Sequence, residues 1–493
     1  MPESHASTLP DHRICEQARL SRDARFDGLF FTAVSSTKVY CRPVCPAPAP
    51  KPANVRYYAS AAAAEAAGFR PCLRCRPELA PGHAAWRPGE QLVSRTLELI
   101  DAGALADHSL EQLATRVGVS SRQLRRLFVE QLGAPPIDVH TTRRLLFAKQ
   151  LLTETALPVT EVALASGFAS LRRFNAAFAQ ANRMPPRELR RQPRAPLGGG
   201  LVLRLAYRPP YDFDALLAFL RTRALPGVEL VDEHAYARVF GDADAPGWLR
   251  LSRWPAGEHA LRLELHGATP PRLMPLVTTL RRMFDLDAEP QAIAATLGAS
   301  EVLKPLLHRR PGLRLPGGWD GFEIAVRAVL GQQLSVAAAR TLATRIVQRW
   351  GTPLSAPPMA GLERLFPTPA QLADADLREI GVTTARAATI VAIARALLDG
   401  RADFRAGQSL DAFVARWVAL PGIGEWTAHY MAMRALSHPD AFPAADLILR
   451  RAAAGGGGAE LGSKALTALA EAWRPWRAYA VMHLWRSASD GKP

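Results

Sequence analysis

A proline- and glycine-rich run at residues 192–200 constrains the fold more than any other stretch, because neither a helix nor a strand continues through it. Before the run, residues 90–192 place apolar side chains at helical spacing, with turn residues between the groups. After it the period shifts, and residues 201–207, Leu-Val-Leu-Arg-Leu-Ala-Tyr, have the pattern of a strand. The chain of 493 residues is also too long for one hydrophobic core. We therefore expect several domains, with a boundary at this run.

The local patterns predict four domains in a multidomain fold that is mainly α with α+β parts. Residues 1–85 carry short strand patterns and a short helix, which predict a small α+β domain. Residues 89–192 predict an all-α domain. Residues 200–285 mix strand patterns with a helix and predict a second α+β domain, whereas residues 290–493 predict an all-α domain.

The chain is strongly basic, with a net charge of +16 and a pI of about 10.3, which points toward a polyanionic partner, most simply nucleic acid. Residues 1–200 hold 27 Lys and Arg against 17 Asp and Glu, so this part should supply most of the salt-dependent attraction to DNA. No stretch approaches the roughly 18 consecutive apolar residues of a membrane span. Residues 1–10 lack the apolar region of a secretory signal. We therefore expect neither membrane insertion nor secretion.

Four of the five cysteines form two close pairs, and all five precede Arg76. The pairs are Cys41 with Cys45 and Cys72 with Cys75, separated by 26 residues. Four thiolates at this spacing suit one tetrahedral Zn²⁺ ion, whereas disulfides are disfavoured without an export signal. The spacing alone leaves open whether such a zinc ion is purely structural. Cys15 stands apart and is expected to be a small core or surface residue.

The motifs Cys41-Arg-Pro-Val-Cys45 and Cys72-Leu-Arg-Cys75, with their flanking residues, resemble the N-terminal zinc domain of the Ada family of bacterial methylation-response proteins. The resemblance implies that Cys41 is both a zinc ligand and a sacrificial nucleophile. It would accept the methyl group of a methylphosphotriester in the DNA backbone. Zinc would keep the sulfur as a thiolate, and methylation would remove a negative charge that repels DNA phosphates.

One loop departs from the pattern of that family. Residues 46–50 read Pro-Ala-Pro-Ala-Pro where the family tends to carry basic residues, so phosphate contact by this loop stays open. The remaining candidates for phosphate contact in this domain are Arg42, Arg70 and Arg74.

Two segments have the form of a helix-turn-helix motif. In residues 109–128, Gly118 supplies the turn, and Ser120 caps a helix that can enter the major groove. Residues 159–178 repeat the form. The arginines expected to contact DNA are Arg122, Arg125, Arg126, Arg172 and Arg173.

Such a pair resembles the AraC-type DNA-binding domain, which implies sequence-specific binding to a promoter. The chain has no Pro-Cys-His-Arg motif and no cysteine after Cys75, so we do not expect direct reversal of O6-alkylguanine.

A glycine-containing turn between two helices is predicted at residues 420–430, Leu-Pro-Gly-Ile-Gly-Glu-Trp-Thr-Ala-His-Tyr. Gly422 and Gly424 leave backbone N–H groups open to a DNA phosphate. Asp446 follows shortly downstream, where a carboxylate can act on a nucleotide held by the turn, although it could also simply cap the next helix. The arrangement favours an enzyme that acts on a single base in duplex DNA.

Residues 201–490 resemble the AlkA family of 3-methyladenine DNA glycosylases, through this hairpin and through residues 310–316, 322–336 and 473–480. The resemblance implies an antiparallel α+β domain followed by an all-α helix-hairpin-helix domain, and it makes Asp446 the catalytic residue. A carboxylate there would stabilise the oxocarbenium charge that develops on the sugar. Alkylation already makes the base a good leaving group, so no strong general acid is required.

The hairpin also indicates the subclass. Trp426 stands where related lyases carry a Schiff-base lysine, which favours monofunctional hydrolysis. No cofactor is expected for this chemistry, since the four cysteines of an iron–sulfur cluster are absent near the end of the sequence.

The family match also assigns positions around the DNA. It places Trp426, Tyr430 and Trp485 around the flipped base, where aromatic faces suit an electron-poor alkylated base. It places Gln333 at the position that enters the duplex, with Leu334 beside it, and Arg486 where a further pocket aromatic is usual. The backbone carbonyls that could bind a monovalent cation at the hairpin belong to Val418, Leu420 and Ile423.

The leading hypothesis is a monomeric methylation-damage response protein of the bacterial cytoplasm, associated with the nucleoid. Its expected partners are damaged DNA, a promoter site and RNA polymerase. The alternative is a transcriptional regulator whose glycosylase half is inactive and used only for DNA binding. A third hypothesis makes the zinc domain purely structural.

Overall fold

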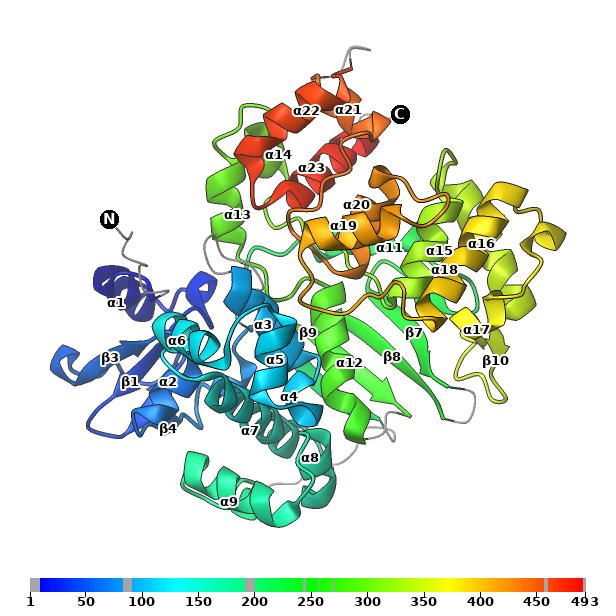
Figure 1. Cartoon of the computed structure of the whole chain (residues 1–493). Coiled ribbons are helices and arrows are strands. Elements are labelled where there is room, and N and C mark those ends of the chain that lie inside the picture. The colour runs from blue at the N-terminus through cyan, green and yellow to red at the C-terminus, as the bar shows by residue number, and fades with distance from the viewer. Residues whose placement is uncertain are drawn as a thin grey trace. The chain divides into compact units, whose positions relative to one another are not determined.

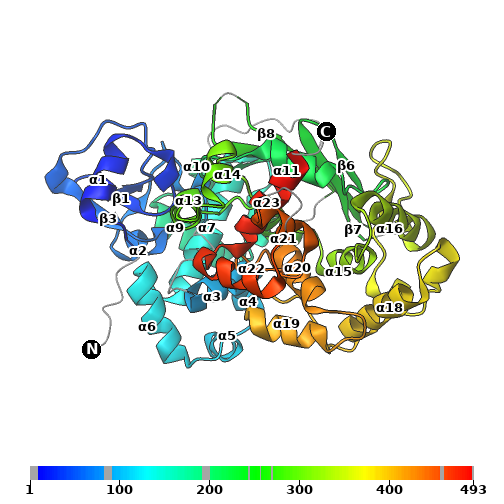
Figure 2. The same ribbon diagram turned by 90° about the horizontal axis from the view of Figure 1, so that it is seen from above.

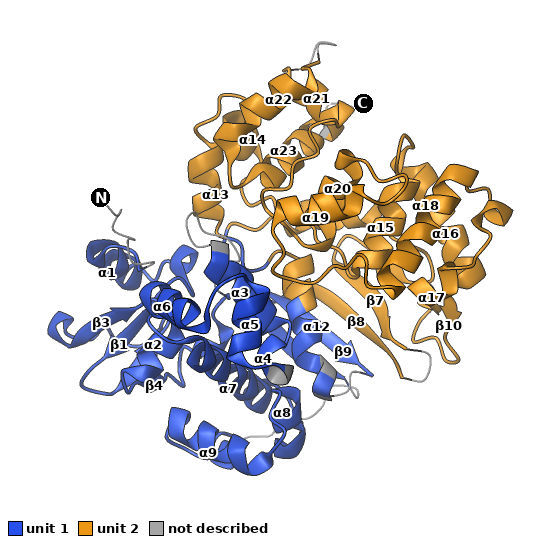
Figure 3. Ribbon diagram, in the orientation of Figure 1, with its two compact units in different colours: residues 1–209, 254–278, 286–288 blue, residues 210–253, 279–285, 289–493 orange. Residues whose placement is uncertain are grey.

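The computed structural model describes residues 9–82, 91–190, 200–242, 245–255, 257–267, 270–455 and 460–490 (Figure 1). Most of the run at residues 192–200, and the expected boundaries near residues 85 and 89, therefore lie outside the described residues. The chain forms two compact units (Figure 3). Unit 1 consists of Met1–Pro209, Trp254–Thr278 and Leu286–Ala288, and unit 2 of Pro210–Arg253, Thr279–Asp285 and Glu289–Pro493. Within the described ranges, no helix has the length and apolar character needed to cross a membrane.

A four-stranded sheet forms the first part of unit 1, in the order β3-β1-β2-β4. The pairs β1·β2 and β1·β3 are antiparallel, and β2 and β4 are parallel. Aromatic and alanine side chains, among them Phe31, Tyr40 and Phe69, form its core. The elements are α1 (His12–Leu20), β1 (Phe31–Val34), β2 (Val39–Cys41), β3 (Val55–Tyr58), α2 (Ala61–Ala66) and β4 (Arg70–Pro71), with 3-10 turns at Ala24–Phe26, Pro52–Asn54 and Pro77–Leu79.

Helices make up the second part of unit 1. The side chains of Ser109 and Ser120 cap α5 and α6, and Ser170 caps α9, so each begins where a hydroxyl accepts a backbone N–H. Gly118 and Gly167, at φ +81° and +77°, turn the chain between the helices of each pair. The helices are α3 (Gln91–Asp101), α4 (Ala104–Asp107), α5 (Leu110–Arg116), α6 (Ser121–Leu132), α7 (Pro136–Glu154), α8 (Val159–Ala165), α9 (Leu171–Asn182) and α10 (Pro186–Leu189).

Helix α7 joins the sheet to the helical part through buried charge. Lys149 of α7 lies 2.5 Å from the Glu78 carboxylate and donates to the carbonyl of Cys72 at 3.3 Å; the side chains of both charged residues are almost fully buried. Unpaired, either charge would be very costly in this position. The segment that carries Cys72 is therefore fixed against the helix by an interior ion pair.

The antiparallel strands β5 (Leu201–Ala206) and β9 (Ala260–His266) complete unit 1. The backbone of Arg204 in β5 bonds to the side chains of Gln150 and Glu154 on α7. Beyond β5, the fully buried Arg208 donates to the carbonyls of Asp27 and Gly82, at 2.8 and 2.6 Å. The parts of unit 1 are thus connected by specific polar contacts as well as by the chain itself.

Unit 2 begins with α11 (Phe213–Arg221) and the antiparallel strands β6 (Glu229–Val231), β7 (Ala235–Gly241) and β8 (Pro246–Arg253). Arg238 of β7 is buried between the carboxylates of Glu229, at 3.0 Å, and Glu323, at 2.5 Å. Glu323 lies on α15, so this ion triad fastens the first helix of the helical body to the strands. Helix α12 (Pro270–Met283) follows the strands in the chain.

The rest of unit 2 is helical. Helix α15 packs against α18 and α20, and α19 packs against α20 (Figure 2). Helices α21 and α23 pack against each other. The elements are α13 (Pro290–Leu297), α14 (Lys304–Arg309), α15 (Gly321–Leu330), α16 (Val336–Trp350), β10 (Thr352–Pro353), β11 (Arg364–Leu365), α17 (Pro369–Leu372), α18 (Thr384–Leu398), α19 (Leu410–Val418), α20 (Glu425–Ala435), α21 (Leu447–Ala453), α22 (Ser463–Ala470) and α23 (Arg477–Asp490), with 3-10 turns at Leu377–Ile380 and Glu471–Trp473.

Candidate functional site

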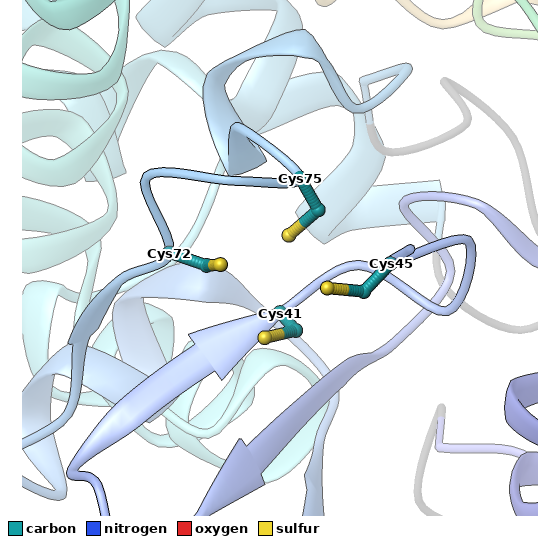
Figure 4. A group of neighbouring side chains, drawn as sticks. All are labelled: Cys41, Cys45, Cys72 and Cys75. Atoms are coloured by element: carbon teal, nitrogen blue, oxygen red, sulfur yellow. The ribbon is translucent and has the colours of Figure 1, made fainter. Parts of the chain in front are cut away.

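Four cysteine sulfurs gather at the edge of the small sheet of unit 1 (Figure 4). The sulfurs of Cys41, Cys45, Cys72 and Cys75 all lie within 4.8 Å of one another. The parallel pairing of β2 with β4 explains the gathering, since the Cys72 N–H donates to the carbonyl of Tyr40 at 3.0 Å and so brings the second pair beside Cys41. The expected cysteine cluster is therefore confirmed.

The donor set fits one zinc ion. Around tetrahedral Zn²⁺, with Zn–S bonds of about 2.3 Å, sulfurs lie roughly 3.8 Å apart, within the spread of the cluster. All four cysteines are free of disulfides. Hydrogen bonding with Cys45 raises the pKa of the Cys41 thiol, whereas hydrogen bonding with Cys41 lowers that of Cys72. Neighbouring sulfurs are therefore not all thiolates on their own, whereas a divalent cation would stabilise the thiolate form of all four.

The two sides of the cluster differ in access. Cys72 and Cys75 are buried, whereas Cys41 and Cys45 are half-buried. The backbone N–H of Arg42 donates to the Cys75 sulfur at 3.4 Å, which stabilises negative charge there. Cys41 is therefore a ligand that an incoming group could reach, while the buried pair anchors the site.

Arg42 has a different role from the phosphate contact for which it was a candidate. Its guanidinium pairs with the buried Asp27, with Nε 2.9 Å from Oδ1, and donates to the carbonyl of Cys75 at 3.2 Å. Its side chain is only 14% exposed. Arg74 is exposed and Arg70 half-buried, so these two keep the more accessible guanidinium groups.

The expected recognition helices of unit 1 present basic surfaces. Buried Leu124 and Phe128 anchor α6, and buried Phe174 and Phe178 anchor α9 at the same four-residue spacing. This leaves the opposite face of each helix in solvent. The exposed arginines there are Arg122, Arg125, Arg126, Arg172 and Arg173.

In unit 2, α19, a short turn and α20 form the expected hairpin. Gly422 has φ +81°, and a Cβ at this position would lie 2.0 Å from the Thr389 hydroxyl, so only glycine fits. Gly424 is the N-cap residue of α20 and meets no such neighbour. Both glycines are exposed, so the backbone around the start of α20 can be approached from solvent.

A second loop is tied to this hairpin. The Gln332 side chain donates to the carbonyl of Gly422 and to the Thr427 hydroxyl, both at 3.0 Å. The next residue, Gln333, has a left-handed backbone at φ +55° and is exposed, and Leu334 is 37% exposed. These two hydrogen bonds place Gln333 and Leu334, which are expected to enter the duplex, beside the hairpin that is expected to bind the DNA backbone.

Asp446 lies between three helices. It is the N-cap of α21, where Oδ1 accepts the Leu449 N–H at 3.0 Å. The indole N–H of Trp426, on α20, donates to Oδ2 at 3.0 Å, and the indole N–H of Trp485, on α23, donates to Oδ1 at 3.3 Å. Asp446 is thus a helix cap and also the centre of a polar cluster, so the two sequence-based interpretations of this residue are compatible.

The expected pocket aromatics are neighbours. The rings of Trp426 and Tyr430 stack with centroids 5.4 Å apart and planes 14° from parallel, and the Tyr430 and Trp485 rings lie 6.3 Å apart. Their spacing on α20 puts Trp426 and Tyr430 on one face of that helix.

An arginine missed by the sequence analysis completes this cluster. Arg434 donates to the Tyr430 hydroxyl at 3.1 Å. Burial alone would raise the pKa of that phenol, but Arg434, Arg223 and Arg327 together hold it below its ordinary value. The four-residue spacing of Tyr430 and Arg434 on a helix is the signal that could have revealed the pair.

Comparison with known proteins covers the chain in four parts. Residues 14–78 match the metal binding domain of Ada, and residues 113–192 match a helix-turn-helix domain. Residues 202–320 match the AlkA N-terminal domain, and residues 326–477 match the HhH-GPD superfamily of base excision DNA repair proteins.

Two relatives and one solved structure give the extent of the similarity. The "probable bifunctional transcriptional activator/DNA repair enzyme AlkA" of Mycobacterium tuberculosis (strain H37Rv) is 40% identical over 485 residues, 96% of each chain. The DNA-3-methyladenine glycosylase 2 of Escherichia coli (strain K12) is 35% identical over 285 residues, which is 57% of this chain and 95% of that protein. The structure of 3-methyladenine DNA-glycosylase from Archaeoglobus fulgidus aligns with a TM-score of 0.51 at 22% identity, over 59% of this chain and 99% of that one, a likeness of fold.

Proposed function

The chain belongs to the family of bifunctional transcriptional activator/DNA repair enzymes of the AlkA type, and from this membership we propose how its two reactive centres act on alkylated DNA. It is a DNA-3-methyladenine glycosylase joined to an Ada-type methyl-acceptor domain. It binds DNA through its helix-turn-helix and glycosylase domains. The observation that carries the catalytic proposal is the Asp446 carboxylate, held by two indoles beside the hairpin.

Asp446 is the catalytic residue of base excision in this proposal. As the bond between C1′ and the alkylated base lengthens, positive charge develops on the sugar, and the carboxylate stabilises it. Water then completes the hydrolysis, leaving an abasic site. No lysine takes part, because Trp426 occupies the hairpin position where a Schiff-base lysine would stand.

The residues around Asp446 form the base pocket and the contacts with DNA. Trp426, Tyr430 and Trp485 offer aromatic faces to the flipped base. Gly422 and Gly424 present the hairpin backbone to a phosphate, and Gln333 with Leu334 enters the duplex where the base has left. The carbonyls of Val418, Leu420 and Ile423 stay a predicted site for a monovalent cation.

Cys41 is the acceptor of the second reaction. Its thiolate sulfur attacks the methyl carbon of a methylphosphotriester; the S–C bond forms as the C–O bond breaks, and the phosphate leaves as an ordinary diester anion. Cys41, Cys45, Cys72 and Cys75 would hold the zinc ion, which would keep the sulfur deprotonated at neutral pH. The product is a thioether, so each protein molecule reacts once.

We further propose a transcriptional role in which α6 and α9 read a promoter through their exposed arginines. RNA polymerase is then a partner, and the protein acts as a monomer at the bacterial chromosome, in the cytoplasm. Loss of negative charge at Cys41 on methylation would favour promoter binding, since DNA phosphates are then repelled less.

The test of the catalytic proposal uses the full chain on methylated duplex DNA. We expect the wild type to release 3-methyladenine and Asp446→Asn to release it about 10³-fold more slowly, because the amide cannot offset the sugar charge. The matched control is Asp440→Asn, the same change at an aspartate that pairs with Arg477. Circular dichroism of both variants shows whether a lost activity reflects lost catalysis or lost folding. Full excision by Asp446→Asn would remove this residue from its assigned role.

A further inference from the structure

The Asp446 carboxylate accepts three hydrogen bonds from three different helices. Oδ1 takes the Leu449 N–H and the Trp485 indole N–H, and Oδ2 takes the Trp426 indole N–H. An indole nitrogen can only donate, so each of these bonds fixes a carboxylate oxygen as the acceptor. Each carboxylate oxygen has two lone-pair sites. In the described part of the chain, one site on Oδ2 is left for a substrate.

Unpaired indoles elsewhere in unit 2 show that this pairing is not a general packing requirement. The fully or almost fully buried Trp417, Trp473 and Trp476 each have an indole nitrogen without a hydrogen-bond partner in the described structure. Trp426 and Trp485 are less buried, yet both donate to the same carboxylate. The chain therefore tolerates unpaired indoles in its core and directs two paired ones to Asp446.

On these grounds we infer that Trp426 and Trp485 are positioning residues for Asp446, in addition to the stacking role proposed above; the inference rests on the proposed glycosylase function. Their N–H groups fix the rotation of the carboxylate, because each indole donates to a different oxygen. An indole N–H lies in the plane of the ring, so donating it does not use the ring faces, one of which in Trp426 stacks on Tyr430. The same side chains thus place the base and aim the carboxylate at the sugar attached to it.

The substitution that separates the two roles is Trp to Phe, which keeps an aromatic face and removes the N–H. For Trp426→Phe and Trp485→Phe in the full chain, we expect the single-turnover rate of base release to fall about 10- to 100-fold each. Affinity for the alkylated duplex should change less than the rate does.

A matched control is Trp476→Phe, which removes an indole N–H that has no partner. Its rate of base release and its affinity for the alkylated duplex should match those of the wild type once thermal unfolding has confirmed a folded protein. If Trp426→Phe and Trp485→Phe keep the wild-type rate while the corresponding Ala variants lose activity, only the aromatic faces matter, and the positioning role is overturned. If the wild type itself releases no base, the proposed function fails, and this inference fails with it.

Discussion

The two reactive centres are held in place by different kinds of interaction. The cysteine cluster lies among buried charges, with Asp27 pairing Arg42 and Glu78 pairing Lys149 close to the ligands. Asp446 is held instead by neutral donors, two indoles and one backbone N–H. The difference follows from the chemistry proposed for each. The buried ion pairs fix the segments that carry the ligands of a zinc ion, which would keep the nucleophile anionic, whereas the carboxylate must be aimed at the sugar in every turnover.

The sharpest way to break this comparison is to remove the nucleophile. Cys41→Ser should abolish methyl uptake from methylphosphotriester DNA, because the alcohol is a far weaker nucleophile than the thiolate, and base release should persist. Intact-protein mass spectrometry measures the uptake.

The matched control for that variant is Cys15→Ser. Cys15 is fully buried outside the cluster, and burial, with the nearby Asp11, raises its thiol pKa to about 12, so it stays a thiol at neutral pH. We expect normal methyl uptake in Cys15→Ser. Uptake that survives in Cys41→Ser would move the acceptor to another residue.

The next largest effect should come from the buried ion pair beside the cluster. Lys149→Met leaves the Glu78 carboxylate buried and lacking its lysine, which should lower the free energy of unfolding by about 3–5 kcal/mol. Chemical denaturation, monitored by circular dichroism, measures this free energy of unfolding. Arg25→Met, at an exposed pair with Asp23, should cost about 1 kcal/mol or less. Equal losses of unfolding free energy in Lys149→Met and Arg25→Met would show that the buried ion pair beside the cluster does not stabilise the fold more than an exposed pair does.

Two glycines of the hairpin in unit 2 test the region beside Asp446. Gly422→Ala forces a Cβ toward Thr389 at a left-handed φ, a strain of about 1–3 kcal/mol. We expect affinity for alkylated duplex DNA to fall about 10-fold, as measured by fluorescence anisotropy. Gly424→Ala meets no neighbour and has φ −95°, so its affinity should stay near that of the wild type. The hairpin would lose its assigned role in DNA binding if both variants bind like the wild type.

The smallest effect is expected at the recognition helix. Arg125→Ala should weaken promoter binding and reduce the slope of log affinity against log salt by about 1, if the side chain contacts one phosphate. Base release from alkylated DNA that lacks the promoter should be unchanged. An unaltered salt slope would exclude a phosphate contact by Arg125.

The two centres also differ in how far the sequence predicts them. The cysteine cluster was predictable because its ligands are chemically identical and their spacing carries the information, and the capping of α6 by Ser120 followed from local rules. The hydrogen bonds from Trp426 and Trp485 to Asp446 were not predictable, since they join side chains 20 and 39 residues from the aspartate. The pairing of Arg42 with Asp27 was hidden for the same reason. Both depend on how helices and loops pack in three dimensions.

The measurement that tests the account most directly scores both reactions in one tube. Full-length protein is incubated with methylated duplex DNA, and released base and protein-bound methyl are quantified together for the wild type, Cys41→Ser and Asp446→Asn. We predict both products from the wild type, only free base from Cys41→Ser, and only methylated protein from Asp446→Asn. Loss of both products in either single variant would contradict two separate centres in one chain.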